Sequence, residues 1–546
     1  MDRAYRHRRP TAAAAVLLVP MLLAIAALDP RGVDAALRTV NADIVVYGGT
    51  PAGVVAAVTA KRADPRITVV LIEPSRHLGG MMSNGLGWTD IGAKSTLGGY
   101  TKEVFDRIQL AERTLDGRYH FQPRVAEAAF KAMAASAGVS VRYGLRLRET
   151  AAVSKSGARI STIFMSNGQA FRAKTYIDAS YEGDLMALAG VTYRVGRESR
   201  AAFGESLAGV RPAQQIFALP AGLKMPHTTT APGPLGSADD RIQDSNYRVC
   251  FSSVRTNQVP FAKPLGYDVR DYDVVLEFIR QRAAATSATP QLSWLMYLAP
   301  VANRKFDVNS SGLMSLAVTG LNHTYPEASY AERAALDTQH RRWAKGLLHF
   351  LRYDPRVPYS IRSKLSGYGL CKDEFTDNAN WPRMLYLREG RRMVGAYVLT
   401  QDDVQSSRQK SDIIGIASYR VDAHYVSRWV DGDRRVWAEG SMRLPRANYA
   451  IPYRIMLPRP TEATNLLVPV TSSVSHVAHA SLRMEPHYML MGEAAGQAAA
   501  LTIKVRTTTA KGVTFVRKTS ISVHAVDPKV VQARLKAHGS RLDQPQ

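Results

Sequence analysis

Between residues 42 and 73, two short apolar runs flank a segment in which small and apolar residues recur at helical spacing. Residues 42–47, ADIVVY, are apolar and β-branched, which predicts a buried parallel strand. Residues 52–62 continue as a helix with a small-residue face, and ITVVLIE at 67–73 predicts a second strand. Strand, helix and strand in this order predict a βαβ unit.

The turn between the first strand and the helix is rich in glycine, with Gly48, Gly49 and Gly53. Thr50 is placed to cap the helix, and Pro51 suits its first position, where proline loses no hydrogen bond. A glycine turn at a helix N-terminus lets a pyrophosphate approach the backbone, where unpaired amides receive it. We therefore expect the diphosphate of a dinucleotide to lie on this turn.

Glu73 ends the second predicted strand, 25 residues after Gly48. A carboxylate at this place accepts both hydroxyls of an adenosine ribose. The pattern departs from G-x-G-x-x-G, because Thr50 occupies the second glycine position. For this segment alone, a βαβ unit that binds no ligand is the alternative.

Gly79 and Gly80 follow the acid, in EPSRHLGGMMSNGLGWTDIG at 73–92, and would let the chain pass under a ribityl phosphate. With these residues the sequence resembles the FAD-dependent oxidoreductases of the glutathione-reductase-like superfamily. It resembles in particular a bacterial group with a YGGTPAG start, distantly related to the fumarate reductase flavoproteins. Further matching segments extend the resemblance over roughly residues 42–505: 175–191, 387–404, 451–458 and 465–503.

The resemblance implies an α/β fold with FAD as the cofactor. It implies a discontinuous Rossmann-like FAD-binding domain from residues 42–195 and 450–505, with a mixed α+β substrate domain inserted at 196–449. Residues 506–546 are expected to form a C-terminal appendage, with a strand near residue 521 and a short helix that begins at Asp527 and Pro528.

The helix predicted at 484–503 carries a stripe of small residues at i, i+3, i+4 and i+7. Close packing against another helix is one explanation of this stripe. The resemblance implies a second, in which amides near Gly492–Gly496 face the flavin pyrimidine and stabilise negative charge. The FAD-binding residues that we expect are Gly48, Gly49, Thr50, Pro51, Ala52, Gly53, Glu73, Pro74, Gly79, Gly80, Met81, Leu147, Ala179, Ser180, Asp184, Gly492, Ala495 and Gly496.

Four residues are candidates for catalysis where the two expected domains meet. Oxidation of an alcohol needs a base, for which histidine is the commonest choice, and arginine suits a carboxylate substrate. His476 and Arg483 precede the C-terminal helix, His424 lies in the middle domain, and Arg391 lies in REGRRM at 388–393. For each of them a structural hydrogen bond or ion pair is the alternative.

The chain has a formal net charge of +25, from 71 Lys and Arg against 46 Asp and Glu. These residues are scattered and form no run of five, which favours a basic surface over a specific nucleic-acid site. We expect no metal, because Cys/His spacing of a metal site is absent, and no NAD(P), because a second glycine fingerprint is absent. Cys250 and Cys371 allow one disulfide or two buried thiols.

The N-terminal residues 1–35 have the three parts of a secretory signal: a basic start, an apolar stretch at 11–28, and small residues up to Ala35. Pro20 interrupts the apolar stretch, which favours a cleaved signal over a retained membrane anchor. We therefore expect a secreted or periplasmic protein whose mature chain has no integral membrane span.

Together these features predict an exported FAD-dependent oxidoreductase. It would transfer a hydride between flavin and a small organic substrate, sugar-like or carboxylate, with an electron acceptor that the sequence leaves open. One alternative is fumarate-reductase-like reduction of an activated C=C bond. The other is a non-catalytic basic surface protein that binds polyanions on an FAD fold.

Overall fold

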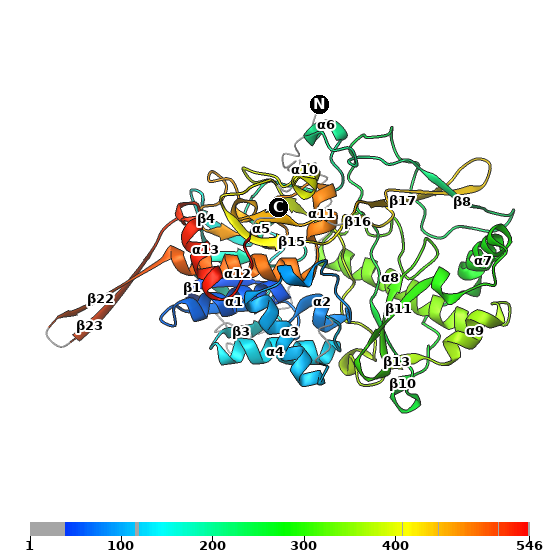
Figure 1. Cartoon of the computed structure of the whole chain (residues 1–546), viewed down its shortest axis with the longest axis horizontal. Helices are drawn as coiled ribbons and strands as arrows, with labels where there is room; N and C mark the ends of the chain where they lie inside the picture. Colours follow the sequence, from blue (N-terminus) through cyan, green and yellow to red (C-terminus); the bar gives the residue numbers. More distant parts are fainter. Residues whose placement is uncertain (1–38, 115–118, 407, 446, 511–512, 544–546) are drawn as a thin grey trace, which may run out of the picture.

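A seven-stranded sheet organises the first part of the computed structural model, which describes residues 39–114, 119–406, 408–445, 447–510 and 513–543 (Figure 1). Its strands are ordered β3-β2-β1-β6-β5-β4, and β21 pairs with β6. The carboxyl ends of the parallel strands β2, β1, β6 and β21 meet at one edge, where ligands bind in such folds. The bounds are β1 (Thr39–Tyr47), β2 (Val69–Glu73), β3 (Ser140–Tyr143), β4 (Val153–Ser156), β5 (Arg159–Phe164), β6 (Ala170–Asp178) and β21 (Leu466–Leu467).

Both faces of this sheet are covered. Alternate residues of β1 point to opposite faces, so Ile44 and Val46 enter one hydrophobic core while Val45 and Tyr47 enter another. Among the helices that contribute to the first core are α1, α3, α4 and α12, of which α1 and α12 pack along each other. Their bounds are α1 (Pro51–Ala63), α3 (Gly99–Glu112), α4 (Pro123–Ser136) and α12 (Glu485–Thr502). This is the Rossmann-like α/β fold that the sequence predicts.

A second body surrounds its own core on the right of Figure 1. A five-stranded sheet in the order β10-β13-β9-β12-β11 packs with helices, and β17-β18-β8 form a smaller sheet. Helix α8 starts with a capping box, in which Ser329 and Glu332 satisfy each other's backbone amides. The bounds are β8 (Gln214–Ala218), β9 (Val249–Ser252), β10 (Gln258–Val259), β11 (Met296–Val301), β12 (Lys305–Ser310), β13 (Gly369–Cys371), β17 (Ser427–Val430), β18 (Arg435–Glu439), α7 (Asp273–Thr286), α8 (Tyr330–Tyr353) and α9 (Tyr359–Ser366).

The chain joins the first core again well before residue 450. Leu399, Ile414 and Val421 belong to that core, and β15 packs against α12. Strands β17 and β18 of the second body therefore belong to a segment whose other parts mostly pack in the first core. Elements at this junction are β7 (Tyr193–Arg194), β14 (Arg392–Met393), β15 (Ile413–Ala417), β16 (Asp422–Ala423), β19 (Met442–Arg443), β20 (Tyr449–Pro452), α2 (Gly80–Asn84), α5 (Asp184–Leu188), α6 (Arg200–Phe203), α10 (Gln401–Gln405) and α11 (His476–Leu482).

Cys250 and Cys371 form a disulfide between adjacent strands of the five-stranded sheet. The antiparallel pairing of β9 with β13 places Leu370 opposite Phe251. Cys371 follows Leu370 and Cys250 precedes Phe251, so the two cysteines are neighbours across the strands. Their Cα atoms are 5.5 Å apart, within the range of a disulfide. Of the two states that the sequence left open, the structure has the bridge.

The C-terminal segment forms a hairpin that extends from the body at the left of Figure 1, and then a short helix. The hairpin of β22 (Ile503–Ala510) and β23 (Val513–Ser520) was not predicted. Helix α13 (Pro528–Ala537) begins as expected, because the Asp527 side chain accepts from the Lys529 amide and Pro528 takes the first turn. A 3₁₀ turn at Val523–Ala525 stands in place of the strand expected near residue 521.

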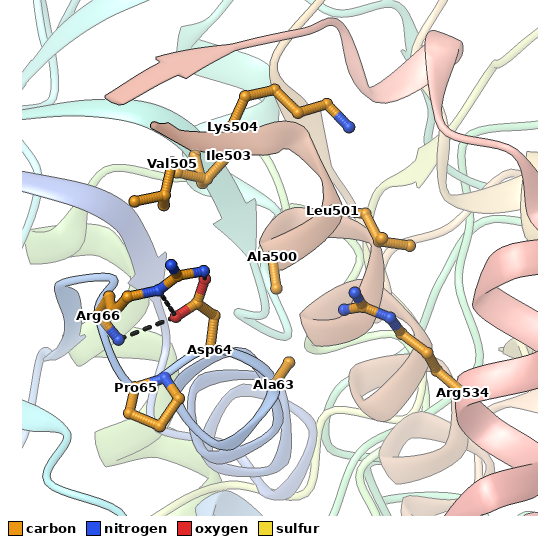
Figure 2. Close-up of a pocket in the computed structure, with 10 residues that line it drawn as sticks. All are labelled: Ala63, Asp64, Pro65, Arg66, Ala500, Leu501, Ile503, Lys504, Val505 and Arg534. Carbon is orange, nitrogen blue, oxygen red and sulfur yellow. Dashed lines mark hydrogen bonds and ion pairs between the residues drawn. The ribbon is translucent and has the colours of Figure 1, made fainter. Parts of the chain in front are cut away.

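Figure 2 shows a surface hollow of about 670 Å³ at the base of this hairpin. Arg66, Lys504 and Arg534 contribute cations to its wall, and Arg66 is paired with Asp64. It lies beyond Ala63, at the C-terminal end of α1, whereas the glycine turn lies at the opposite end of that helix. The hollow is therefore separate from the expected cofactor site. No helix within the described residues is long and apolar enough to cross a membrane.

Candidate cofactor and substrate site

The glycine turn after β1 is closed against the end of β6. Gly48 has φ +100°, and a Cβ on it would lie 2.7 Å from the Ser180 nitrogen. A Cβ on Gly53 would lie 1.9 Å from the Gly48 oxygen. The Thr50 hydroxyl donates to the Ala179 carbonyl at 2.8 Å and accepts from the Gly53 amide at 3.1 Å. Only glycine fits at these two positions, so no side chain at 48 or 53 blocks the backbone of the turn.

The first turn of α1 keeps amides for a ligand. Thr50 satisfies the Gly53 amide, and Pro51 has no amide hydrogen. The helix cannot satisfy the amide of Ala52 itself, because the first four N–H groups of a helix have no intrahelical acceptor. An amide without an intrahelical acceptor, at the positive end of a 13-residue helix, fits one end of a diphosphate.

Glu73 lies beside this turn with its side chain oriented by the backbone. Its Oε2 accepts from the Gly49 amide and its Oε1 from the Ser75 amide, each at 2.7 Å. Burial raises the pKa of the carboxyl, and the two amide hydrogen bonds act against that rise. Each oxygen has a second lone pair for a ribose hydroxyl. Pro74 follows Glu73 in the chain. Leu147 is fully buried, and its carbonyl accepts a hydrogen bond from the Tyr330 hydroxyl at 3.2 Å.

The second glycine pair brings α2 onto the start of α1. Gly79 and Gly80 both have positive φ, at +98° and +45°. A Cβ on Gly80 would lie 2.4 Å from the Tyr181 hydroxyl oxygen and 3.0 Å from Cδ of Pro51. The Met81 amide donates to the same hydroxyl at 3.0 Å. Tyr181, which was not among the predicted site residues, therefore packs against the second glycine pair, which itself lies on Pro51 at the start of α1.

Buried polar atoms without partners gather at α2 and at the start of α12. Burying such a group unpaired costs about 1–3 kcal/mol, so several together indicate a polar ligand. Helix α12 also starts at Met484 without a side-chain cap. Among the described residues these unpartnered atoms are Ser83 Oγ, Asn84 Oδ1, Arg483 Nε, Glu485 Oε2 and His487 Nδ1. The carbonyls, ring nitrogens and phosphates of FAD fit this donor and acceptor set.

The stripe of small residues on α12 faces helix α1, which is the first of the two explanations given for it. A Cβ on Gly492 would lie 2.3 Å from the Ala52 oxygen, and one on Gly496 would lie 2.4 Å from the Ala56 oxygen. Ala495 is fully buried in the same core. Amides in the middle of a helix are already bonded within it. The stripe therefore packs α12 onto α1, and the uncovered amides of α12 are at its first turn.

Asp184 and Arg391, expected in different roles, are paired with each other. Arg391 Nη1 lies 2.7 Å from Asp184 Oδ1, and Arg333 binds both oxygens of Asp184 at 2.7 and 2.9 Å. Arg391 also pairs with Glu327 at 2.8 Å. Ser180, on the neighbouring loop, donates to Asp178 at 2.7 Å. The structure gives these residues partners within the protein, and the hydrogen bonds of Arg391 go to Asp184, Glu327 and the Glu182 carbonyl.

His476 is enclosed in a buried ionic network. Its side chain is 2% exposed, and its Nδ1 lies 2.7 Å from Glu389. Its amide donates to Glu198 at 2.9 Å, and Arg392 pairs with both Glu198 and Glu389. Such enclosure fits a residue that holds α11 in place, which is the structural alternative stated for this histidine.

Three buried arginines surround Tyr386 where the two cores meet. The guanidinium of Arg388 lies 5.1 Å from its ring centre and that of Arg248 lies 5.8 Å away. Arg483 Nη1 donates to the Tyr386 hydroxyl at 3.1 Å. Burial and the like charges of Arg483 and Arg248 lower the pKa of Arg388 to about 10, although Asp244 acts against this. We call these four residues the arginine site.

The three arginines differ in how their charge is balanced. Arg248 pairs with Asp307 at 2.5 Å, and Arg388 with Asp244 at 3.2 Å. Arg483 donates only to neutral oxygens, the Tyr386 hydroxyl and the Asp422 carbonyl at 2.8 Å, and forms no ion pair among the described residues. Arg483 is therefore the cation with room for an anionic ligand.

His424 stands at the open edge of the arginine site. Its Nδ1 lies 3.4 Å from Asp244, and 27% of its side chain is exposed. Protein around the rest of the ring lowers the pKa of His424, the largest cause being burial and the next the charge of Arg388. Asp90 is also exposed, although its pKa is raised by the protein around it. Solvent thus reaches the arginine site from the side of these two residues.

The arginine site and the cofactor site meet at the first turn of α12. Tyr488 lies 6.4 Å from Tyr181, ring centre to ring centre, and its pKa is raised by burial and by the nearby Glu485. Arg483, the residue before the Met484 cap of α12, donates to the Tyr386 hydroxyl. A substrate held by Arg483 would therefore be next to a cofactor bound at the glycine turns, as hydride transfer requires.

Comparison with known proteins identifies the family through sequence. A model of the FAD dependent oxidoreductases matches residues 43–522. A search of curated proteins finds no match. Solved structures with similarity include AlpK, with 13% identity over 55% of this chain and 49% of that chain at a TM-score of 0.25. A 3-ketosteroid-Δ4-(5α)-dehydrogenase from Rhodococcus jostii RHA1 has 15% identity over 29% of this chain and 50% of that chain, at a TM-score of 0.20. The chain thus spans half or less of these solved proteins.

Proposed function

The chain belongs to the FAD-dependent oxidoreductase family, and we propose that it transfers a hydride between FAD and a small organic substrate that carries a carboxylate. The observation that carries this proposal is Arg483, which is 6% exposed and has no carboxylate partner among the described residues. A buried guanidinium without a counter-ion is costly, and a substrate carboxylate removes that cost.

The arginine site would orient the substrate as well as bind it. Arg483 offers Nη donors beside the Tyr386 hydroxyl, so a carboxylate meets a charged donor and a phenol together. Arg388 and Arg248 add positive charge at the same ring. Their own carboxylate partners hold them in place, which leaves Arg483 to respond to the substrate.

His424 is the base that this geometry favours for an alcohol substrate. With Nδ1–H directed at Asp244, the free Nε2 accepts the hydroxyl proton. A lowered pKa keeps the ring neutral near pH 7, so that it is ready to accept this proton. The chemistry that FAD supplies when bound is acceptance or return of the hydride. The alcohol thus loses a proton to His424 and two electrons with the second hydrogen, and becomes a carbonyl.

Anaerobic bleaching of the flavin absorption tests this proposal. The holoprotein is mixed with small 2-hydroxy acids, with their methyl esters and with neutral sugars. We expect the acids alone to bleach the flavin, and Arg483→Gln to raise the half-saturating concentration at least tenfold, because a charged hydrogen bond contributes about 1.5–3 kcal/mol. Arg443→Gln, which removes an exposed guanidinium paired with Asp422, is the matched control. Equal bleaching by acids and esters would refute a carboxylate substrate.

Reduction of an activated C=C bond is a second candidate that the same arginine site supports. An enoate carboxylate binds Arg483 as a hydroxy acid does, so the site alone does not choose the direction of hydride transfer. Dithionite-reduced holoprotein mixed anaerobically with unsaturated carboxylates distinguishes the two. Reoxidation of the flavin by enoates would favour reduction, and its absence together with bleaching by hydroxy acids would favour oxidation.

We also propose that the protein is exported. The disulfide between Cys250 and Cys371 supports this proposal, since such bonds persist in oxidising compartments. The basic and apolar parts of residues 1–35 support it as well, although these residues lie outside the described structure. Expression in the native host, fractionation and N-terminal mass spectrometry test it. A chain found only in the cytoplasm with residues 1–35 intact would contradict export.

A further inference from the structure

Glu485 occupies a special position in the first turn of α12. The side chain is 4% exposed, and its Oε1 accepts from the Tyr181 hydroxyl at 2.5 Å. Its Oε2 is buried and has no partner among the described residues. Tyr181 in turn lies against the second glycine pair, because the space beside Gly80 is bounded by the Tyr181 hydroxyl and by Pro51 at the start of α1. Glu485 is thus one hydrogen bond away from a residue at Gly79 and Gly80, where the ribityl phosphate of FAD is expected.

We infer that Glu485 is a cofactor-positioning residue. In its protonated form, its Oε2 donates a hydrogen bond that holds FAD. A neutral carboxyl has one O–H to donate, and Oε2 is the oxygen that Tyr181 leaves free. An ionised carboxylate at the same place would have no donor and would repel the diphosphate. FAD affinity should therefore depend on the protonation of this one side chain.

The surroundings of Glu485 favour the neutral acid. Burial raises its pKa to about 8, and the Tyr181 hydrogen bond only partly opposes this rise. Arg483, two residues earlier, directs its donors to Tyr386 and to the Asp422 carbonyl. No ion pair of Glu485 with a cation is present among the described residues. At pH 7 the carboxyl is therefore mostly protonated, and above pH 8 it is mostly ionised.

Other titratable groups near Glu485 do not lose protons between pH 7 and pH 9. Burial raises the pKa values of Tyr181 and Tyr488 well above their usual range. Burial lowers the pKa of His487 to about 4, and Arg483 stays charged because nearby phenols and Asp422 outweigh its burial. A change of FAD affinity in this interval that depends on Glu485 is therefore the mark of its own titration.

The sign and size of the effect follow from proton linkage. If FAD binds the protonated form, affinity is nearly full at pH 7 and below, and falls as pH rises through the pKa of about 8. A pKa of about 8 gives a dissociation constant roughly tenfold larger at pH 9 than at pH 7. The inference rests on the family cofactor and not on the carboxylate substrate proposed above, so FAD release tests it even if the substrate proposal fails.

The experiment is dilution of the full-length holoprotein at pH values from 7 to 9, with released FAD measured by its fluorescence. Glu485→Gln keeps a neutral acceptor for Tyr181 and a donor toward the cofactor, so its FAD affinity should be the same at pH 7 and pH 9. Glu493→Gln is the matched control. Glu493 is a buried acid two turns further along α12, with a pKa raised by burial to about 7, and it faces the Tyr100 amide and Ser540. This control should keep the tenfold loss of the wild type.

A second variant keeps the inference testable if Glu485→Gln does not fold. Tyr181→Phe removes the hydrogen bond that lowers the Glu485 pKa, so the pH at which FAD is released should move upward. A wild-type affinity that is constant from pH 7 to pH 9 would overturn the inference. So would an unchanged pH dependence in Glu485→Gln, or an unmoved release midpoint in Tyr181→Phe.

Discussion

Substitution of Gly492 by alanine tests whether the small stripe of α12 packs on α1 or faces the flavin. The added Cβ would lie 2.3 Å from the Ala52 oxygen and 2.9 Å from the Ala52 carbonyl carbon. Carbon contacts are comfortable at about 3.5–4.0 Å, so the two helices would have to separate by roughly 1 Å. The obstacle is backbone, which cannot rotate away as a side chain can.

Two opposing energies decide the outcome. Alanine is favoured over glycine inside a helix by about 1 kcal/mol. Overpacking costs about 1–3 kcal/mol, and a clash with backbone belongs at the upper end of this range. We therefore expect Gly492→Ala to lower the free energy of unfolding by about 2 kcal/mol. Since Ala52 lies in the first turn of α1, FAD affinity should also fall, by about tenfold for one displaced hydrogen bond.

Gly496→Ala is the matched comparison. Its Cβ would lie 2.4 Å from the Ala56 oxygen, so the clash is similar but one turn further from the glycine turn. It should lose about the same stability and keep FAD affinity nearly unchanged. Urea unfolding of both variants, followed by fluorescence titration with FAD, measures the two effects. If Gly492→Ala unfolds like the wild type but shifts the flavin absorption bands, the stripe faces the ring and the packing argument is refuted.

Three further predictions concern single side chains. Burial raises the pKa of Asp43, but hydrogen bonds from Lys174 and Lys518 outweigh this and lower it to about 2. Asp43→Asn should therefore destabilise the protein by about 2 kcal/mol at pH 7, and this difference should disappear as the pH falls from 4 toward 2 in urea unfolding. His424→Gln should slow flavin bleaching by about 10²–10⁴-fold, and an unchanged rate would exclude this base. Because the pKa of His424 is lowered, the rate of the wild type should fall only below pH 6.5. Glu73→Gln should weaken FAD binding about tenfold in fluorescence titration without changing the bleaching rate at saturating FAD.

The sequence predicts the cofactor end of the fold because its determinants are local. The apolar run of β1, the glycine turn, the Thr50 cap and Glu73 all lie within 73 − 42 = 31 positions of each other. The positive φ of Gly48 and the 1.9 Å approach at Gly53 explain why these two positions carry glycine. Helix α13 was predictable for the same reason, since Asp527 and Pro528 determine its start.

The arginine site was not predictable as a unit, because distant segments supply it. Arg248 comes from the end of a loop before β9, Tyr386 from a loop before β14, and Arg483 from the residue before α12's cap. Each looks like an ordinary surface arginine or core tyrosine in sequence. For the same reason the pairing of Arg391 with Asp184 was not predictable, because the two residues are 207 positions apart in the chain.

The hairpin of β22 and β23 had a local signal that the prediction did not use. Thr507 to Thr509 are β-branched, Val513 to Val516 are β-branched or aromatic, and Lys511 and Gly512 separate the two runs in the sequence, a pattern typical of hairpins. The register places Arg506 directly opposite Arg517. Like charges at such a position weaken a hairpin, so strand propensity and the anchor of Lys518 on Asp43 must outweigh them.

The first turn of α12 connects the two halves of the chemistry. Arg483 and Glu485 are two residues apart, yet they point to different sites: Arg483 to Tyr386 and the substrate, Glu485 to Tyr181 and the cofactor. In sequence they read as an opposite-charge pair on a helix start, which would neutralise each other on a surface. Burial with separate partners prevents this, since Arg483 keeps its charge while Glu485 takes up a proton. A cation for the substrate and a neutral acid for FAD can therefore come from the two sides of one helix cap, Arg483 before Met484 and Glu485 after it, and this junction of α11 and α12 can place the substrate next to the flavin.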